Sequence, residues 1–232
     1  MLNTQISVYG IMILLSLLAN IPITAFAAKK YGFTNDECIG ALLYENFGII
    51  FGAKLLTAIQ VLISSGEFNI SRAGFSSYGA VIGAIVCVTI FGWQFKKPIQ
   101  IMLFTFMPSI PLMYAIGKMG CFIAGCCYGI EYGGWGHIIY RYSQVAPAGV
   151  NVFPVQFAEA AIYTFIFAFM FIETIKNKFD LKTLGVSYIM CGSGKLALDF
   201  LRMEHAGQIF SLNQAISVFF IVIGLSIAYA QV

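Results

Sequence analysis

Charged residues are scarce in this sequence. Asp, Glu, Lys and Arg make up 10% of the 232 residues, and 59% are hydrophobic, whereas a soluble domain contains about 25% charged residues. This composition excludes an ordinary soluble domain and indicates an integral membrane protein. The net charge of +3 is small and scattered along the chain, so no nucleic-acid partner is expected.

Several other patterns are missing. The apolar stretches lack the short alternation of an outer-membrane barrel, but they are long enough for helices, which need about 20 residues to cross a membrane. No internal repeat is evident, which disfavours an inverted-repeat transporter. The six cysteines follow neither a secreted disulfide framework nor the paired spacing of a zinc site. We therefore expect one all-α membrane domain, residues 1–232, without a metal or cofactor.

Hydropathy predicts seven transmembrane helices, at residues 5–27, 38–64, 74–94, 99–120, 152–174, 183–203 and 210–230. Lysines follow the first, third and fifth spans, at Lys29, Lys30, Lys96, Lys97, Lys176, Lys178 and Lys182. The positive-inside rule makes those loops cytoplasmic, with the N-terminus outside and the C-terminus cytoplasmic. Residues 130–151, rich in Gly, Trp, Tyr and Pro, are expected to form an external loop at the membrane interface.

Ionisable residues also occur within or at the ends of these spans, at Glu45, Lys54, Lys118, Glu159, Lys195 and Asp199. Each charge at a span centre costs about 2.5–3.5 kcal/mol, so such residues need partners or water. Snorkelling to the interface is the alternative for a lysine near a span end. The three arginines, Arg72, Arg141 and Arg202, fall on the side opposite the lysine-rich loops, which suggests that they bind something.

The sixth span has a charged face. Lys195, Asp199 and Arg202 are four and three residues apart, so all three share one side of a helix. Asp199 neutralises only one of the two cations, and the surplus positive charge favours an anion such as phosphate. A self-satisfied set of ion pairs is the alternative.

A glycine-rich stretch, "GKMGCFIAGCCYG", runs from Gly117 to Gly129. Its four glycines allow the backbone to approach a ligand or another helix closely. Lys118 adds positive charge beside them.

At these residues the sequence resembles the bacterial prolipoprotein diacylglyceryl transferases. That family has a signature of the form G-R-x-G-N-F-x-N-x-E-x-x-G, and the glycine-rich stretch matches it in register at Gly117, Gly120, Phe122 and Gly129. The family's R-x-x-x-E-x-x-R motif is matched by Lys195, Asp199 and Arg202 with each charge sign kept. "VYGIM", "FSSYGAVIG", "FPVQFAEA" and "SLNQ" resemble further family motifs in the same order.

The resemblance implies a multi-pass enzyme of the bacterial cytoplasmic membrane. It would transfer a diacylglyceryl group from phosphatidylglycerol to the lipobox cysteine of a prolipoprotein and release glycerol phosphate. Arg202 would bind the phosphate, with Lys195 and Lys118 supporting it and Asp199 holding these cations in place. The other site residues that the resemblance implies are Tyr9, Tyr78, Gly120, Cys121, Cys126, Gly129, Gln156 and Glu159. Of these, Tyr9 and Gln156 would contact the headgroup, and Glu159 would be a structural or orienting acid.

The sequence departs from the family at several of these positions. Lys118 replaces an arginine, Cys121 and Ala124 replace asparagines, and Cys126 replaces a glutamate. Tyr78 replaces a histidine, and a phenol is a poor base near neutral pH. Two proton-handling groups are therefore missing, and His137 and His205 are candidate replacements.

The roles of Cys121, Cys126 and Cys127 stay open at this point. Four alternatives are open: small polar packing residues, a disulfide, a nucleophile or thiol relay, and metal ligands. Cys38, Cys87 and Cys191 are expected to be small apolar residues within helices. Three alternative functions remain: a related transferase with another acceptor, a lipid-binding protein without chemistry, and a membrane thiol-redox protein.

Overall fold

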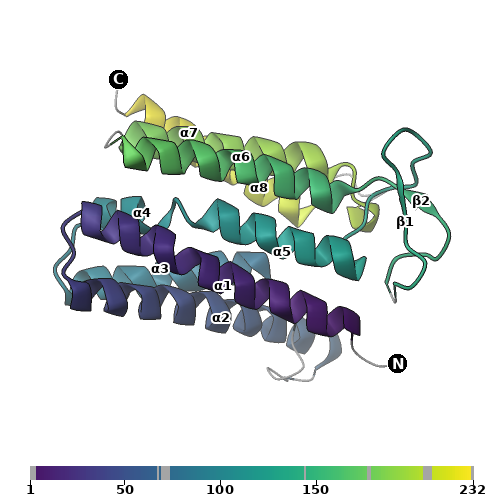
Figure 1. Ribbon diagram of the computed structural model, residues 1–232, viewed down its shortest axis with the longest axis horizontal. Coiled ribbons are helices and arrows are strands. Elements are labelled where there is room, and N and C mark those ends of the chain that lie inside the picture. The colour runs from purple at the N-terminus through teal and green to yellow at the C-terminus, as the bar shows by residue number, and fades with distance from the viewer. Residues whose placement is uncertain are drawn as a thin grey trace. The chain divides into compact units, whose positions relative to one another are not determined.

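The computed structural model describes residues 4–66, 68, 74–143, 145–176, 179–205 and 211–230. Their helices are α1 (Thr4–Lys30), α2 (Asn35–Ser65), α3 (Ser77–Gln94), α4 (Ile99–Phe106), α5 (Ile110–Ala124), α6 (Val155–Ile175), α7 (Leu181–Asp199), the 3-10 helix η1 (Met203–His205) and α8 (Leu212–Tyr229). Two short strands, β1 (Ile138–Ile139) and β2 (Asn151–Val152), pair antiparallel between α5 and α6 (Figure 1). The all-α prediction is therefore confirmed.

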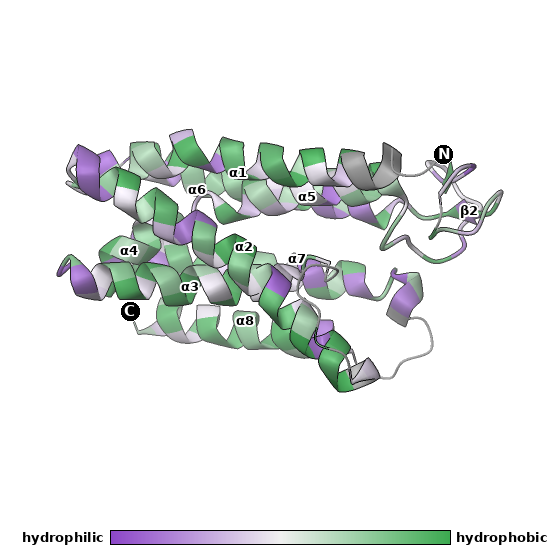
Figure 2. Ribbon diagram, turned by 90° about the horizontal axis from the view of Figure 1, so that it is seen from below, coloured by the Kyte–Doolittle hydropathy of each residue, from purple (hydrophilic) through white to green (hydrophobic). Residues whose placement is uncertain are grey.

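Within the described residues, five segments are long and apolar enough to cross a membrane: Val8–Lys30, Asn35–Ile63, Ser77–Gln94, Ile99–Ala124 and Val155–Ile175. They correspond to the first five predicted spans. Hydrophobic residues cover most of α1, α2 and α3 (Figure 2), and large apolar side chains such as Leu43, Ile63 and Phe165 point outward. Outward-facing apolar side chains fit a lipid environment. The chain is thus a helical membrane protein.

The fourth predicted span is two helices, because α4 ends at Phe106 and α5 begins at Ile110. Pro108 lies between them and lacks a backbone N–H, and a residue before proline is disfavoured in helical conformation. A second proline, Pro111, lies in the first turn of α5, where the backbone N–H groups have no helical partner. The sixth predicted span is also shorter than expected, because α7 ends at Asp199 and Arg202 lies beyond the helix.

The chain forms two compact units. One contains residues 21–106, and the other contains residues 1–20 and 107–232. In the first unit α2 packs along α3 through glycines, since Gly52 and Gly79 face each other, as do Gly48 and Gly83. This packing is the small-residue interface typical of membrane helices.

Two intramembrane charges of this first unit are partnered. Thr24 donates to the buried carboxylate of Glu45 over 3.3 Å. Lys54 lies over the ring of Phe75, 5.1 Å from its centroid. Both contacts supply the partners that charged groups at membrane depth require.

In the second unit α5 packs on α6, α6 on α7 and α7 on α8. Gly185 and Gly224 bring the backbones of α7 and α8 together. The loop between α5 and α6 includes residues 130–151 and exposes Trp135, Ile139 and Tyr142. These are the amphipathic and apolar side chains expected at a membrane interface.

Candidate functional site

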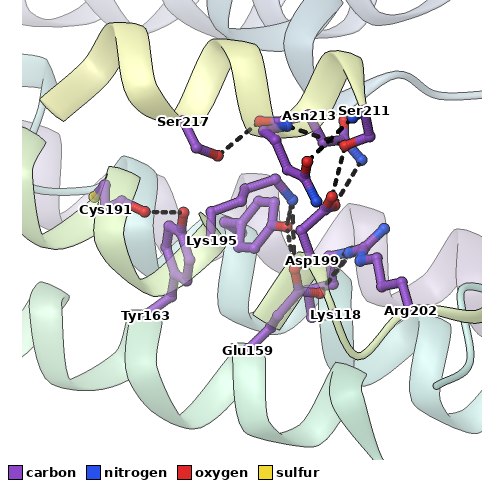
Figure 3. Close-up of polar contacts among 12 residues, drawn as sticks. Lys118, Glu159, Tyr163, Cys191, Lys195, Asp199, Arg202, Ser211, Asn213 and Ser217 are labelled. Atoms are coloured by element: carbon purple, nitrogen blue, oxygen red, sulfur yellow. Dashed lines mark hydrogen bonds and ion pairs between the residues drawn. The ribbon is translucent and has the colours of Figure 1, made fainter. Parts of the chain in front are cut away.

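A buried carboxylate on α6 lies among three cations. The carboxylate of Glu159 contacts Lys118 Nζ at 2.9 Å, Lys195 Nζ at 3.4 Å and Arg202 Nη2 at 2.7 Å (Figure 3). All four side chains are nearly or completely buried, with exposed fractions of 0–11%. We call these four residues the Glu159 cluster. Since three positive charges surround one negative charge, the cluster has a formal surplus of positive charge.

Glu159 lies there because of the buried face of α6. Gln156, Glu159 and Tyr163 are three and four residues apart and all buried, so they lie on one side of the helix. Tyr163 donates to the backbone oxygen of Cys191 on α7 over 3.1 Å. This hydrogen bond ties α6 to the helix that carries Lys195.

Tyr114 links two members of the cluster. Its hydroxyl donates to Glu159 Oε1 over 3.2 Å and accepts a short hydrogen bond from Lys195 Nζ. Both Lys118 and Lys195 also lie over the Tyr114 ring, 5.2 and 4.9 Å from its centroid. Sequence reasoning missed this residue, although Tyr114 lies four residues before Lys118 and therefore on the same face of α5.

Arg202 is positioned by backbone pairing. Gly129 forms a bridge with Arg202, Ile130 N–H donates to Leu201 O over 3.0 Å, and Met203 N–H donates to Tyr128 O over 3.2 Å. A Cβ at Gly129 would meet the backbone oxygen atoms of Phe153 and Leu201. The pairing therefore depends on the absence of a side chain at Gly129.

The guanidinium of Arg202 uses only part of its donor capacity on Glu159. Its Nη2 bonds both carboxylate oxygens, at 2.8 and 2.7 Å. Its Nε is buried and makes no hydrogen bond within the described part of the chain. Because leaving a buried donor unpaired costs about 1–3 kcal/mol, this Nε is suited to an anionic ligand.

The role predicted for Asp199, holding the cations in place, stays a prediction. The Asp199 carboxylate accepts hydrogen bonds from Ser211 at 2.6 Å and Asn213 at 3.2 Å, which connects the end of α7 to the start of α8. The carboxylate that contacts all three cations is Glu159. The three predicted cations therefore converge, but around the acid that was expected only to orient them.

Gln156 supports the loop after α5. Its Nε2 donates to Cys126 O over 2.8 Å and to the Tyr140 hydroxyl over 3.3 Å, while its Oε1 is buried without a hydrogen-bond partner among the described residues. Burial raises the pKa of Tyr140 to about 12, although the Gln156 hydrogen bond opposes this. Tyr140 thus stays protonated and donates to Phe122 O over 3.0 Å.

The glycine-rich stretch contains the end of α5 and the turn after it. A Cβ at Gly120 would meet Met12 and the ring of Tyr9, so Gly120 permits close packing against α1. By contrast, a Cβ at Gly117 would meet nothing within 4 Å, so Gly117 is not needed for helix packing, and close approach of a ligand there stays a prediction. Cys121, Cys126 and Cys127 are clustered thiols, not disulfides.

Other predicted residues lie elsewhere. Tyr78 is in the first turn of α3 and belongs to the unit of residues 21–106, so its catalytic role stays a prediction. His137 is exposed and its Nδ1 lies 3.0 Å from Gly134 O, and Arg141 is exposed in the same loop. His205 lies in η1, and Arg72 falls outside the described residues.

The fold and the site together define a class: a helical membrane protein with a buried, positively charged cluster suited to an anion. The sequence model of the prolipoprotein diacylglyceryl transferases matches residues 1–230. The chain belongs to this family.

Individual relatives agree with this assignment. A phosphatidylglycerol–prolipoprotein diacylglyceryl transferase of Clostridium tetani is 30% identical over 228 residues, covering 94% of this chain and 90% of that protein. A second, from Clostridium perfringens, is 28% identical and covers 94% and 88%. A third, from Dehalococcoides mccartyi, is 30% identical and covers 95% and 86%.

Proposed function

We propose that this protein transfers the diacylglyceryl group of phosphatidylglycerol to the cysteine thiol of a prolipoprotein and releases glycerol phosphate. The three relatives described above are named as phosphatidylglycerol–prolipoprotein diacylglyceryl transferases, which supports the proposal. The observation that carries the proposal is the Glu159 cluster, in which three buried cations share one carboxylate. Such a cluster suits a substrate whose charge lies on a phosphate.

The reaction creates negative charge on the phosphate. The acceptor thiolate attacks the glyceryl carbon bonded to the phosphate oxygen, a C–S bond forms, and the C–O electron pair leaves with glycerol phosphate. The phosphodiester of the substrate carries one negative charge. The departing glycerol phosphate is a monoester and carries more negative charge than the diester. Fixed cations at that oxygen stabilise the transition state more than the ground state.

Arg202 is the proposed phosphate ligand. Its buried Nε has no partner among the described residues, and a guanidinium donates to phosphate oxygens in a planar, directed geometry. Lys118 and Lys195 supply further positive charge, and Glu159 fixes the positions of all three cations. Asp199 acts indirectly, by joining α7 to α8 through Ser211 and Asn213.

The proposed setting is the bacterial cytoplasmic membrane. We infer seven spans, with α7 and α8 as the sixth and seventh, the N-terminus outside and the C-terminus cytoplasmic. The lysines after the first, third and fifth spans support this orientation. The Glu159 cluster would then face the outer leaflet, where secreted prolipoproteins meet the membrane.

The test combines purified protein, phosphatidylglycerol vesicles and a lipobox peptide, followed by mass analysis of the peptide and assay of glycerol phosphate. Wild-type protein is expected to form both thioether-linked peptide and glycerol phosphate in equal amounts. Arg202→Ala should lower turnover at least about 100-fold, corresponding to about 2.7 kcal/mol of transition-state stabilisation.

A conservative variant and a distant one complete this test. Arg202→Lys keeps the charge but loses the planar fork, so intermediate turnover is expected. Lys176→Ala removes an exposed lysine paired only weakly with Glu173 at 3.8 Å and should leave turnover unchanged. Absence of both products with wild-type protein would refute the proposed function, and full activity of Arg202→Ala would refute its phosphate role.

A further inference from the structure

Three cysteine thiols converge after α5. The Sγ atoms of Cys121, Cys126 and Cys127 all lie within 4.8 Å of one another. Cys121 is buried, and the other two are half-buried. A metal ion needs at least three His, Cys, Asp or Glu side chains close together. Among the described residues, these three cysteines are the group that meets this condition.

The backbone turn that gathers the thiols contains two residues with a positive φ, one of them not a glycine. Gly125 has a left-handed φ of 73°, and its N–H donates to Cys121 O at 2.9 Å. Cys126 N–H bonds the same oxygen at 3.2 Å. Cys127 also has a positive φ, 55°, which costs about 1–3 kcal/mol for a residue with a side chain. Strain of this kind is concentrated at functional sites.

Neighbouring side chains hold this turn in place. Gln156 donates to Cys126 O, Tyr140 to Phe122 O and Ser143 to Ala124 O, at 2.8, 3.0 and 3.2 Å. These hydrogen bonds occupy backbone oxygens and fix the turn without using any thiol. The three Sγ atoms are therefore preorganised as a set of ligands.

We propose that Cys121, Cys126 and Cys127 bind a zinc ion as thiolates, with the acceptor thiol of the prolipoprotein as the fourth ligand. This inference rests on the proposed function. Three protein ligands plus a substrate position are typical of catalytic zinc, and zinc–sulfur bonds of about 2.3 Å place tetrahedral sulfurs about 3.8 Å apart. Zinc binding would draw the three thiols, which lie within 4.8 Å of one another, to that separation.

The surrounding charges fit a zinc–thiolate group. Zinc with three thiolates has a net negative charge, and a fourth thiolate makes it more negative. Lys118 lies three residues before Cys121 on α5, and Arg202 pairs through its backbone with Gly129, two residues after Cys127. Both cations are therefore placed to offset this charge. Soft thiolates and the absence of a carboxylate from the ligand group favour zinc over magnesium or calcium.

Zinc would solve the problem of deprotonating the acceptor. A thiol that coordinates zinc is deprotonated outright, and its proton passes to water. The coordinated thiolate then attacks the glyceryl carbon as described above. The product thioether is neutral and a weaker ligand, so it leaves the zinc ion. No electron is lost or gained, and no oxidant or reductant is needed.

The first test measures metal content. Protein purified without chelator should contain about one zinc ion per chain by mass spectrometry of the metals. The zinc content should fall at least tenfold in the triple variant Cys121→Ser, Cys126→Ser and Cys127→Ser. The thermal unfolding midpoint of this variant shows whether it folds. The matched control, Cys191→Ser, lies on α7 outside the thiol group and should keep its zinc.

The second test follows ligand exchange by spectroscopy. Cobalt(II) in place of zinc should give thiolate-to-metal charge-transfer bands and the visible bands of tetrahedral cobalt. A lipobox peptide should increase the charge-transfer intensity, and the same peptide with serine in place of cysteine should not. Failure of wild-type protein to bind zinc or cobalt, or a disulfide within the trio, would overturn the proposal.

The outcomes separate this inference from the proposed function. Transferase activity that persists in protein freed of metal would refute the zinc proposal and leave the function standing. Zinc binding without any transferase activity would refute the function and, with it, the acceptor-thiol part of the inference. Activity lost with a chelator and restored by zinc supports both.

Discussion

Glu159 is the residue whose removal should be most damaging, because three buried cations share its carboxylate. Glu159→Gln keeps the shape but leaves these cations without a negative partner. Breaking a buried ion pair in this way costs about 3–5 kcal/mol. We expect a lower unfolding midpoint in detergent, measured by differential scanning fluorimetry, and almost no transferase activity.

Glu173→Gln is the matched control for this prediction. Glu173 is on the same helix, and its ion pair with Lys176 spans 3.8 Å at a partly exposed site. Such pairs contribute about 0–1 kcal/mol. An unfolding midpoint that falls equally for both variants would contradict the central position of Glu159.

Tyr114→Phe tests the link between Lys195 and Glu159. The substitution removes one hydroxyl and its two hydrogen bonds while keeping the ring beneath both lysines. A hydrogen bond to a charged group is worth about 1.5–3 kcal/mol. We expect activity to fall at least about tenfold with kcat affected more than KM, measured with phosphatidylglycerol at several concentrations.

Tyr163→Phe is a useful comparison because Tyr163 donates to a backbone oxygen and not to the cluster. It should lower stability but leave kcat nearly unchanged. Equal loss of kcat in both variants would contradict a specific role for the Tyr114 hydroxyl.

The sequence predicted the cations of the site but not its centre. Lys118, Lys195 and Arg202 stood out because charge is costly in a membrane. Helical spacing then paired Asp199 with Lys195 and Arg202, whereas Glu159 comes from another helix. The spacing of residues within one helix does not indicate which other helix packs beside it. For the same reason, the sequence did not predict Ser211 and Asn213 as hydrogen-bond partners of Asp199.

At the scale of elements, the α2–α3 interface depends on glycines. A Cβ at Gly83 would overlap the backbone oxygen of Gly48, and the two helices would have to separate. Overpacking of this kind costs about 1–3 kcal/mol. Gly83→Ala is therefore expected to lower the unfolding midpoint, measured in the same detergent.

Gly10→Ala serves as the control, because a Cβ at Gly10 meets nothing within 4 Å. Alanine is favoured over glycine in a helix by about 1 kcal/mol, so this variant should be unchanged or slightly more stable. A Gly83→Ala protein as stable as wild type would show that the close packing of α2 and α3 is dispensable.

The helices themselves were largely predictable, and their interruptions were not. Long apolar runs identify helices at membrane depth because unpaired backbone groups are too costly there. Hydropathy, however, does not distinguish one span from two helices separated by a short break in the sequence, as with α4 and α5. Pro108 was the available signal for that break. Arg202 was placed within a span for a similar reason, since the residues after Asp199 remain apolar enough to continue one.

For the whole molecule, the inferred orientation places Trp135 outside and Lys96 in the cytoplasm. Trp135 is 98% exposed, so a cysteine there should react readily. In intact cells, a membrane-impermeant maleimide should label Trp135→Cys, and Lys96→Cys should be labelled only after the cells are permeabilised. The parent chain, with its six cysteines, gives the background in each condition. The reverse pattern would overturn the orientation.

The shared carboxylate also has a consequence for biosynthesis. Lys118 on α5 is translated before the loop between the helices, and Glu159 on α6 only after it. If α5 entered the membrane alone, the lysine would lack its partner, at a cost of about 2.5–3.5 kcal/mol at the centre of the bilayer. Insertion of α5 and α6 as a pair avoids this cost. Loss of Glu159 would therefore reduce the amount of protein inserted into the membrane, and it would also lower the stability of the inserted protein.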